Sequence, residues 1–335
     1  MQIHDISDYY RPKRFPWLPV SLIGIGVMIA LVHVFSKNEQ APKHNDPDVV
    51  EAEASATDTR NKQGIEEPFK SQPAYAPLPL PPTAEPSNPL PPAEIDAVLA
   101  ECRTLETNGQ LEGAREKYLT ILDRTGGKIR PQIEQTIGRL SIELFTTPRP
   151  MKGKVEYIIQ SGDSLSKIAA KHNCPILLIQ KANNISDPAR IRIGTRLILP
   201  NKPNFSLVVS KAENTLAILL NGQLFKKYSV GTGIHSKTPV GTFRISDKIA
   251  NPPWWPGDGR AVIPYGAKEN ILGTHWLALE ATGETPKLSG YGIHGTWEES
   301  SIGRQSSAGC VRMRNTDVGE LYMLLPRDTP VRIIE

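Results

Sequence analysis

Cysteine is scarce in this chain, which contains only Cys102, Cys174 and Cys310 in 335 residues. Three cysteines so widely separated cannot build a disulfide framework or a metal knuckle. Cys102 falls on the apolar face of an expected helix and Cys174 within a small domain, so both fit structural positions. A bridge between these two is the minor alternative, open only in an oxidising compartment.

Compact metal-ligand spacing is also lacking. The four candidate ligands are His235, His275, His294 and Cys310. Their separations fit no known zinc pattern, and zinc would block a cysteine nucleophile. The sequence therefore predicts no metal and no other cofactor.

A strong charge excess of either sign is missing. The net charge of +4 is too small to imply nucleic acid as a partner. Residues 37–93 carry five basic and nine acidic side chains, whereas residues 151–202 carry nine basic and three acidic ones. The basic excess of the second segment fits contact with an anionic polymer and fits a solvated surface equally well. Charge alone does not separate these two interpretations.

Long apolar runs are rare, and the longest spans residues 17–35 without an Asp, Glu, Lys or Arg. That length is close to the roughly 20 residues that cross a bilayer as a helix. Three basic residues precede it: Arg11, Lys13 and Arg14. The positive-inside rule then predicts residues 1–16 in the cytoplasm, residues 17–36 as a single membrane anchor, and the rest in the periplasm or cell wall. A cleaved signal peptide is the rival interpretation, although no small-x-small site follows Phe35.

Residues 37–92 are polar and acidic and then rich in proline. Nine of the 30 prolines lie between Pro73 and Pro92. Such a composition buries too little apolar surface to offset chain entropy, so it predicts a disordered stalk.

From residue 93 to 147 the apolar residues recur at helical spacing, which predicts three short helices. The apolar faces are Ile95, Val98, Leu99, Cys102 and Leu105, then Leu111, Ala114, Tyr118, Ile121 and Leu122, then Ile133, Ile137, Leu140 and Leu144. The segment from Gly109 to Tyr118 resembles part of a tetratricopeptide repeat. A small helical spacer is favoured over a surface that recruits a partner protein, which stays open.

Residues 153–202 show a β-α-α-β order. A strand that begins near Tyr157 leads to Gly162-Asp163-Ser164, where Asp163 or Ser164 can cap the next helix. A second helix follows, and a strand ending at Pro200 closes the segment. The segment resembles a LysM module, which implies binding of N-acetylglucosamine-containing glycan. By this resemblance the loop holding Gly162, Asp163 and Ser164 is the expected glycan contact.

Near the C-terminus, a histidine and a cysteine occur in glycine-rich surroundings, in Tyr291–Thr296 and Ser307–Met313. The thiolate is the reactive form of cysteine, and an imidazole nearby can accept its proton. Gly309 allows a tight turn before Cys310, so that consecutive amides face a developing oxyanion. The pattern predicts a cysteine nucleophile with His294 as its base.

Short apolar runs separated by glycine and proline fill residues 204–335. Asn221-Gly222 between two of these runs is a strong type I′ hairpin signal. This pattern predicts an all-β sandwich or barrel. Four tryptophans are expected to serve as core or loop anchors rather than as substrate contacts: Trp254, Trp255, Trp276 and Trp297.

The C-terminal segment resembles the L,D-transpeptidases, with their YkuD-type catalytic domain. The resemblance rests on His294-Gly295-Thr296, Ser307-x-Gly309-Cys310-x-Arg312, Val230–Gly233, Thr238–Phe243, Leu272–Trp276, Asn315–Asp317 and Glu320–Tyr322. Together with the segments predicted above, it gives a multidomain protein in which an all-β catalytic domain follows a LysM module, a helical region and a transmembrane helix.

The family's reaction implies that Cys310 attacks a tetrapeptide stem of peptidoglycan and releases D-alanine. His294 takes the thiol proton, and the carbonyl of Gly295 orients its imidazole. Transfer of the acyl group to an amine then cross-links the cell wall. The expected partners are stem peptides, glycan strands and the membrane.

Supporting roles follow from the same resemblance. The amides of Gly309 and Cys310 are expected to bind the oxyanion, while Ser307 and Arg312 hold the loop and set local electrostatics. Many family members have a second histidine where this chain has Ala308, so a mechanism with two imidazoles is not expected. An L,D-carboxypeptidase that uses water, and a non-catalytic wall-binding tether, are the alternatives.

Overall fold

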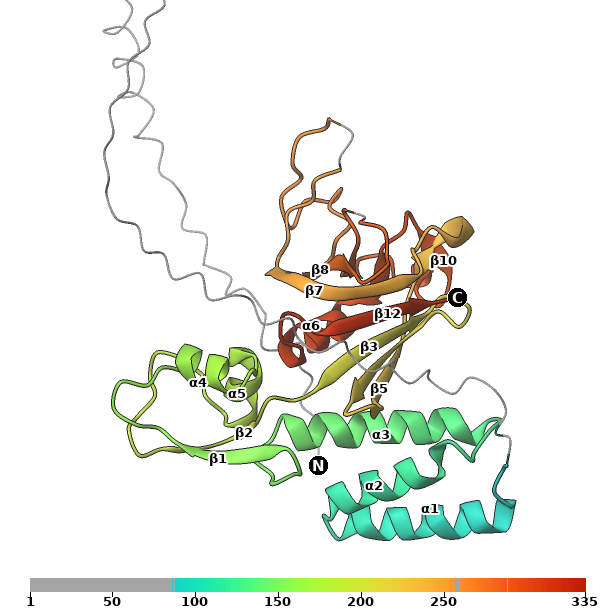
Figure 1. Ribbon diagram of the computed structural model, residues 1–335, viewed down its shortest axis with the longest axis vertical. Helices are drawn as coiled ribbons and strands as arrows, with labels where there is room; N and C mark the ends of the chain where they lie inside the picture. Colours follow the sequence, from blue (N-terminus) through green and yellow to red (C-terminus); the bar gives the residue numbers. More distant parts are fainter. Residues whose placement is uncertain (1–85, 87, 257–258, 288) are drawn as a thin grey trace, which may run out of the picture. The chain divides into compact units, whose positions relative to one another are not determined.

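A computed structural model describes residue 86 and residues 88–256, 259–287 and 289–335 (Figure 1). The predicted anchor at 17–36 and nearly all of the predicted stalk lie outside these residues. Within the described part of the chain, no helix is long and apolar enough to cross a bilayer.

The three helices expected after the stalk are present. They are α1 (Pro92–Thr107), α2 (Leu111–Leu122) and α3 (Ile129–Phe145). The predicted boundary at residue 92 lies too late in the chain, because Leu90 is already buried and its backbone N–H donates to the carbonyl of Arg124. The last residues assigned to the stalk thus pack with the helices.

The next segment consists of β1 (Lys154–Ile158), α4 (Leu165–Lys171), α5 (Ile176–Ala182) and β2 (Arg196–Pro200), with the two strands antiparallel. Ser164 is the helix cap, because its hydroxyl accepts a hydrogen bond from the Lys167 amide at 3.2 Å. The closing strand begins at Arg196, after a turn in which Gly194 has a φ of +82°.

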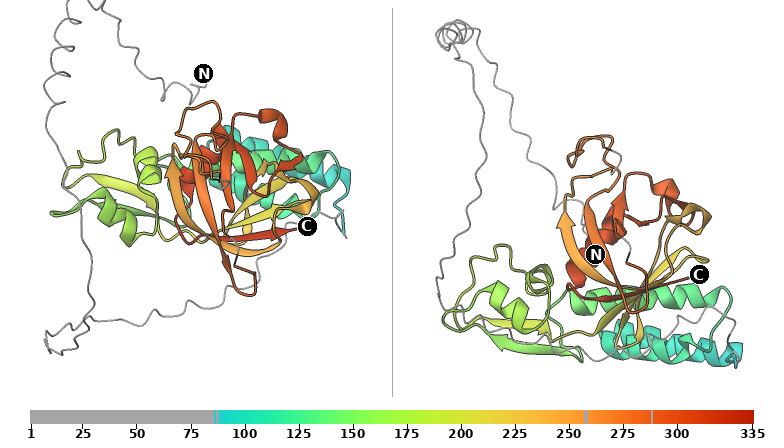
Figure 2. Two further views of the ribbon diagram at one scale, coloured as in Figure 1. Left: turned by 90° about the horizontal axis from the view of Figure 1, so that it is seen from above. Right: turned by 45° about the horizontal axis from the view of Figure 1, so that its top comes forward.

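Eight strands of the C-terminal segment form one mixed sheet in the order β11-β9-β8-β7-β12-β3-β4-β5. These strands are β3 (Phe205–Ser210), β4 (Thr215–Leu220), β5 (Gln223–Ser229), β7 (Gly241–Ala250), β8 (His275–Thr282), β9 (Gly292–Thr296), β11 (Val311–Arg314) and β12 (Pro330–Ile334). The sheet twists along its length (Figure 2). Asn221 and Gly222 both have positive φ, as the predicted type I′ hairpin requires.

Two shorter elements complete this segment. Strands β6 (Thr232–Gly233) and β10 (Gln305–Ser307) pair in parallel. Helix α6 (Asn315–Leu324) follows β11 directly, so the expectation of an all-β domain is incomplete. The Lys248 ammonium donates to the last-turn carbonyls of Tyr322 and Leu325, at 2.6 and 2.5 Å, and so caps the C-terminal end of this helix.

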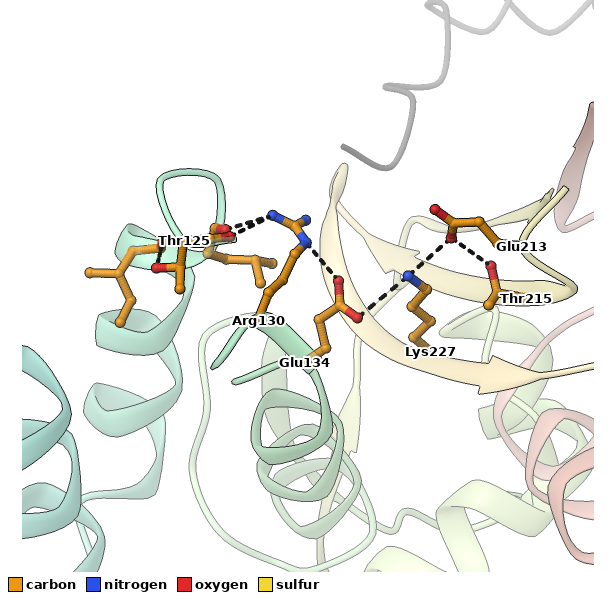
Figure 3. Close-up of polar contacts among 8 residues, drawn as sticks. Thr125, Arg130, Glu134, Glu213, Thr215 and Lys227 are labelled. Atoms are coloured by element: carbon orange, nitrogen blue, oxygen red, sulfur yellow. Dashed lines mark hydrogen bonds and ion pairs between the residues drawn. The ribbon is translucent and has the colours of Figure 1, made fainter. Parts of the chain in front are cut away.

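Helix α3 contacts strand β5 through both charged and aromatic residues. Glu134 lies between Arg130 at 3.0 Å and Lys227 at 3.4 Å (Figure 3). The Phe145 ring meets that of Phe225 edge-on, with centroids 4.9 Å apart. The helical region is therefore more than the spacer expected from sequence, because it packs against the edge strand of the sheet.

Between β7 and β8 the chain makes an excursion, the 251–274 loop. Its two ends meet, because the Asn251 amide donates to the carbonyl of Thr274 at 2.8 Å. Inside the loop, the Asn270 side-chain amide donates to the carbonyls of Pro252 and Ile263, at 3.0 and 3.2 Å. The described part of this loop is thus held by its own hydrogen bonds.

Candidate active site

Neighbouring strands bring the predicted nucleophile and base together. Strands β9 and β11 run parallel, with His294 opposite Arg312, and Cys310 immediately precedes β11. Because side chains alternate along a strand, Cys310, Arg312 and His294 belong to the same face of the pair. The register therefore sets the His294 side chain beside that of Arg312, two residues after the Cys310 thiol.

The backbone fixes the orientation of the His294 ring. Its Nδ1 lies 2.6 Å from the carbonyl oxygen of Gly295, which can only accept a hydrogen bond. Nδ1 therefore carries the proton, and Nε2 keeps a lone pair. Burial lowers the pKa of His294 to about 4, and the bond to Gly295 partly opposes this effect. At neutral pH the ring is an uncharged base.

The Cys310 thiol is in its protonated form in this site. Its Sγ–H donates to the carbonyl of Gly290 at 3.5 Å. Burial raises the pKa of the Cys310 thiol, while hydrogen bonding to the Gly292 backbone and the charge of Arg312 act in the opposite direction. The resting pair at pH 7 is thus a thiol and a neutral imidazole, rather than the ion pair that cysteine enzymes also use.

A serine closes the turn that carries the thiol. The Ser307 hydroxyl donates to the Cys310 carbonyl at 2.6 Å and accepts from the Gly309 amide at 3.1 Å. Gly309 has a φ of +142°, and a Cβ there would lie 2.9 Å from the Tyr291 ring, so the position requires glycine. Because the Gly309 amide already has an acceptor, the Cys310 amide is the better placed of the two expected oxyanion donors.

Arg312 adds positive charge beside the pair. Its Nη1 lies 3.3 Å from a Glu298 carboxylate oxygen, and its buried Nε has no hydrogen-bond partner among the described residues. This guanidinium favours the thiolate of Cys310 and disfavours the imidazolium of His294. The electrostatic role expected of Arg312 in the reaction stays a prediction.

Asp163, Gly162 and Ser164, the expected glycan contacts, form a tight turn. The Asp163 carboxylate accepts from the Tyr157 hydroxyl and the Gln160 amide, both at 2.8 Å, and Gly162 has a φ of +82°. With Ser164 capping α4, these residues shape the loop. Ile193, which precedes β2, is apolar and yet 71% exposed.

The remaining histidines and cysteines have separate surroundings. His235 is exposed, whereas the ring of half-buried His275 lies 4.6 Å from that of Tyr322. Cys102 and Cys174 are buried free thiols, so the alternative of a disulfide between them is wrong. Among the described residues, no three His, Cys, Asp or Glu side chains gather closely enough to hold a metal ion.

The tryptophans divide into two kinds. Trp276 is partly buried and stacks on His294, while Trp255 and Trp297 are 61% and 55% exposed. Their exposure excludes a core position for the last two, and their expected role as loop anchors stays a prediction. Trp297 lies 6.4 Å from Tyr265 of the 251–274 loop, measured between ring centroids.

Two family comparisons match the segments described above. Residues 204–333 match the L,D-transpeptidase catalytic domain, and residues 157–200 match the LysM domain.

Curated relatives agree with these matches. The chain is 33% identical over 183 residues to a Bacillus subtilis protein that carries the name L,D-transpeptidase YkuD, covering 53% of this chain and 97% of the relative. It is 36% identical over 138 residues to a second B. subtilis protein, named L,D-transpeptidase YqjB, covering 41% of this chain and 74% of the relative. A solved L,D-transpeptidase from Mycobacterium smegmatis aligns at 19% identity and a TM-score of 0.32, over 43% of this chain and 65% of that one.

Proposed function

Because this chain belongs to the L,D-transpeptidase family, we propose that it cross-links peptidoglycan through an acyl-enzyme on Cys310. The donor is a tetrapeptide stem, cut between its third residue and the terminal D-alanine. The observation that supports the proposal is the strand register, which pairs His294 with Arg312, two residues after Cys310.

Acylation needs one proton to move twice. As Sγ of Cys310 attacks the stem carbonyl, Nε2 of His294 removes the thiol proton, and a carbon–sulfur bond forms. The imidazolium then returns that proton to the departing D-alanine amine, and the carbon–nitrogen bond breaks. The thiol hydrogen bond to Gly290 must be exchanged for one to the ring first.

Deacylation reverses the roles. An amine from a second stem attacks the thioester, and His294 takes its proton as the new amide forms. The proton then passes to the departing sulfur, which restores the resting thiol. The negative charge that develops on the carbonyl oxygen in both steps is stabilised by the Cys310 backbone amide.

The LysM segment supplies a second binding site for the same polymer. Binding of glycan by residues 157–200 raises the local concentration of stem peptides near Cys310. The basic excess of this segment is compatible with that role. In this proposal, residues 17–36 anchor the protein and the catalytic segment works outside the cytoplasm, next to its substrate.

The test incubates the full-length protein with a purified disaccharide-tetrapeptide, beside a Cys310→Ala control, with mass spectrometry as the readout. The expected product is a dimer lighter than two substrates by one free D-alanine, absent from the control. Tripeptide without dimer would identify an L,D-carboxypeptidase. No change that depends on Cys310 would overturn the enzymatic proposal in favour of a wall-binding tether.

A further inference from the structure

The side-chain amide of Asn315 joins two strands next to the histidine. Asn315 is the first residue of α6, directly after β11. Its Oδ1 accepts from the Thr274 backbone amide at 2.9 Å, and its Nδ2 donates to the Thr296 carbonyl at 3.0 Å. One amide group thus ties the approach to β8 to the end of β9.

Two glycines make room for this amide. A Cβ at Gly273 or at Gly295 would overlap Oδ1 of Asn315. Gly273 also has a φ of +64°, which disfavours any side chain there. The backbone therefore closes around the amide from two sides, and neither segment can shift without displacing it.

The β9 segment carries the carbonyl that hydrogen-bonds the imidazole of His294, and the segment before β8 carries the Leu272 carbonyl, which acts to raise the pKa of that ring. The Gly295 carbonyl accepts from Nδ1, and the Leu272 carbonyl also favours the protonated ring. Gly295 precedes Thr296, and Leu272 stands two residues before Thr274. The two backbone atoms that Asn315 binds are thus one and two residues away from the two carbonyls.

We propose that Asn315 is a positioning residue for catalysis. By fixing the Gly295 carbonyl, it keeps the proton of His294 on Nδ1 and leaves Nε2 free to receive the proton of Cys310. This inference rests on the proposed function, because it assigns Asn315 to the same reaction. Asn315 itself touches neither the thiol nor the imidazole through any described hydrogen bond.

The test follows alkylation of Cys310 by iodoacetamide as a function of pH, in the full-length protein, with mass spectrometry to locate the label. Asn315→Ala is expected to lower the plateau rate about ten- to hundredfold, because a misaligned general base loses part of its contribution. The acid limb of the plot of alkylation rate against pH is expected to move to lower pH. The reason is that the hydrogen bond from the ring to the Gly295 carbonyl, which favours the imidazolium, is weakened.

Other groups around the His294 imidazole could also shift the acid limb of the alkylation profile. Arg312 from β11 is the charged side chain that faces His294, and it acts to lower the pKa of the ring. Trp276 from β8 covers the ring without charge. Neither of these two is altered by the substitution, so a shift of the acid limb reports on the Gly295 carbonyl.

Lys248→Met is the matched control, because it removes the cap at the opposite end of α6 and should leave the plateau rate and the acid limb unchanged. Asn315→Ser retains one polar group and serves as the second variant if Asn315→Ala does not fold; it should give an intermediate rate.

Three results would overturn the inference. The first is a wild-type rate in the folded Asn315 variant. The second is an acid limb that moves to higher pH, which would mean that the ring has merely opened to water. The third is an equal loss of rate in Lys248→Met. Alkylation needs no peptidoglycan, so a wild-type protein that fails to make dimers would count against the proposed function alone.

Discussion

Trp276 and His294 are direct cross-strand neighbours whose rings stack, with centroids 5.7 Å apart and planes 26° from parallel. The tryptophan ring also covers Gly292, where a Cβ would lie only 2.5 Å from it. Trp276 thus forms a wall that keeps water from the imidazole. Since burial is the main cause of the low pKa of His294, this wall sets the acidity of the proposed base.

Trp276→Ala should raise the pKa of His294 from about 4 toward the ordinary histidine value, because water gains access to the ring. The active form has a neutral imidazole, so the acid limb of Cys310 alkylation should move to higher pH. The opposite direction is expected for Asn315→Ala. An acid limb that stays in place in Trp276→Ala would show that the ring is shielded by other groups.

The resting protein should hold little thiolate at Cys310 at pH 7, because burial raises the pKa of the thiol and lowers that of His294. The ultraviolet thiolate absorbance of the wild type, measured against Cys310→Ala, should be close to zero at neutral pH. It should appear only at alkaline pH. A clear thiolate band at pH 7 would instead indicate a preformed ion pair.

Gly295→Ala should be strongly destabilising, since its new methyl group would overlap Oδ1 of Asn315. Combining it with Asn315→Ala removes the obstacle, so the two effects should not add. Urea unfolding of the four proteins in the cycle should give a coupling of about 0.5–3 kcal/mol. Simple additivity would show that the backbone relaxes around the methyl group without involving Asn315.

Phe145→Ala should lower the free energy of unfolding by about 3–5 kcal/mol, because this ring is 2% exposed and packs against both Phe205 and Phe225. Ile193→Ala is a suitable control, since its side chain is 71% exposed and the change should be within about 0.5 kcal/mol. Thermal or urea unfolding measures both. A small loss for Phe145→Ala would favour the original expectation of a helical spacer.

Local chemistry explains which features could be predicted from sequence. The hairpin at Asn221-Gly222 and the cap at Ser164 each depend on a few neighbouring residues. The amphipathic faces of α1 to α3 depend on periodicity within one segment. These features could be predicted because the residues that cause them are close together in the sequence.

Features created by distant contacts could not be predicted in this way. Helix α6 is short, and Lys248, which hydrogen-bonds its C-terminal end, lies on the distant strand β7. The parallel register of β9 with β11 joins segments that no local pattern links. Family resemblance pointed to Cys310 and His294, but only the packing places Asn315 beside the segment that holds the imidazole.

The two ends of the 251–274 loop are hydrogen-bonded to each other, so changes within the loop need not alter the sheet. Because the Asn251 amide meets the Thr274 carbonyl, the excursion leaves and rejoins the sheet at one point. Doubling the length of a flexible loop costs only about 0.6 kcal/mol in closure entropy. The tip of this loop can therefore change in length or sequence while the strands on either side of it keep their positions.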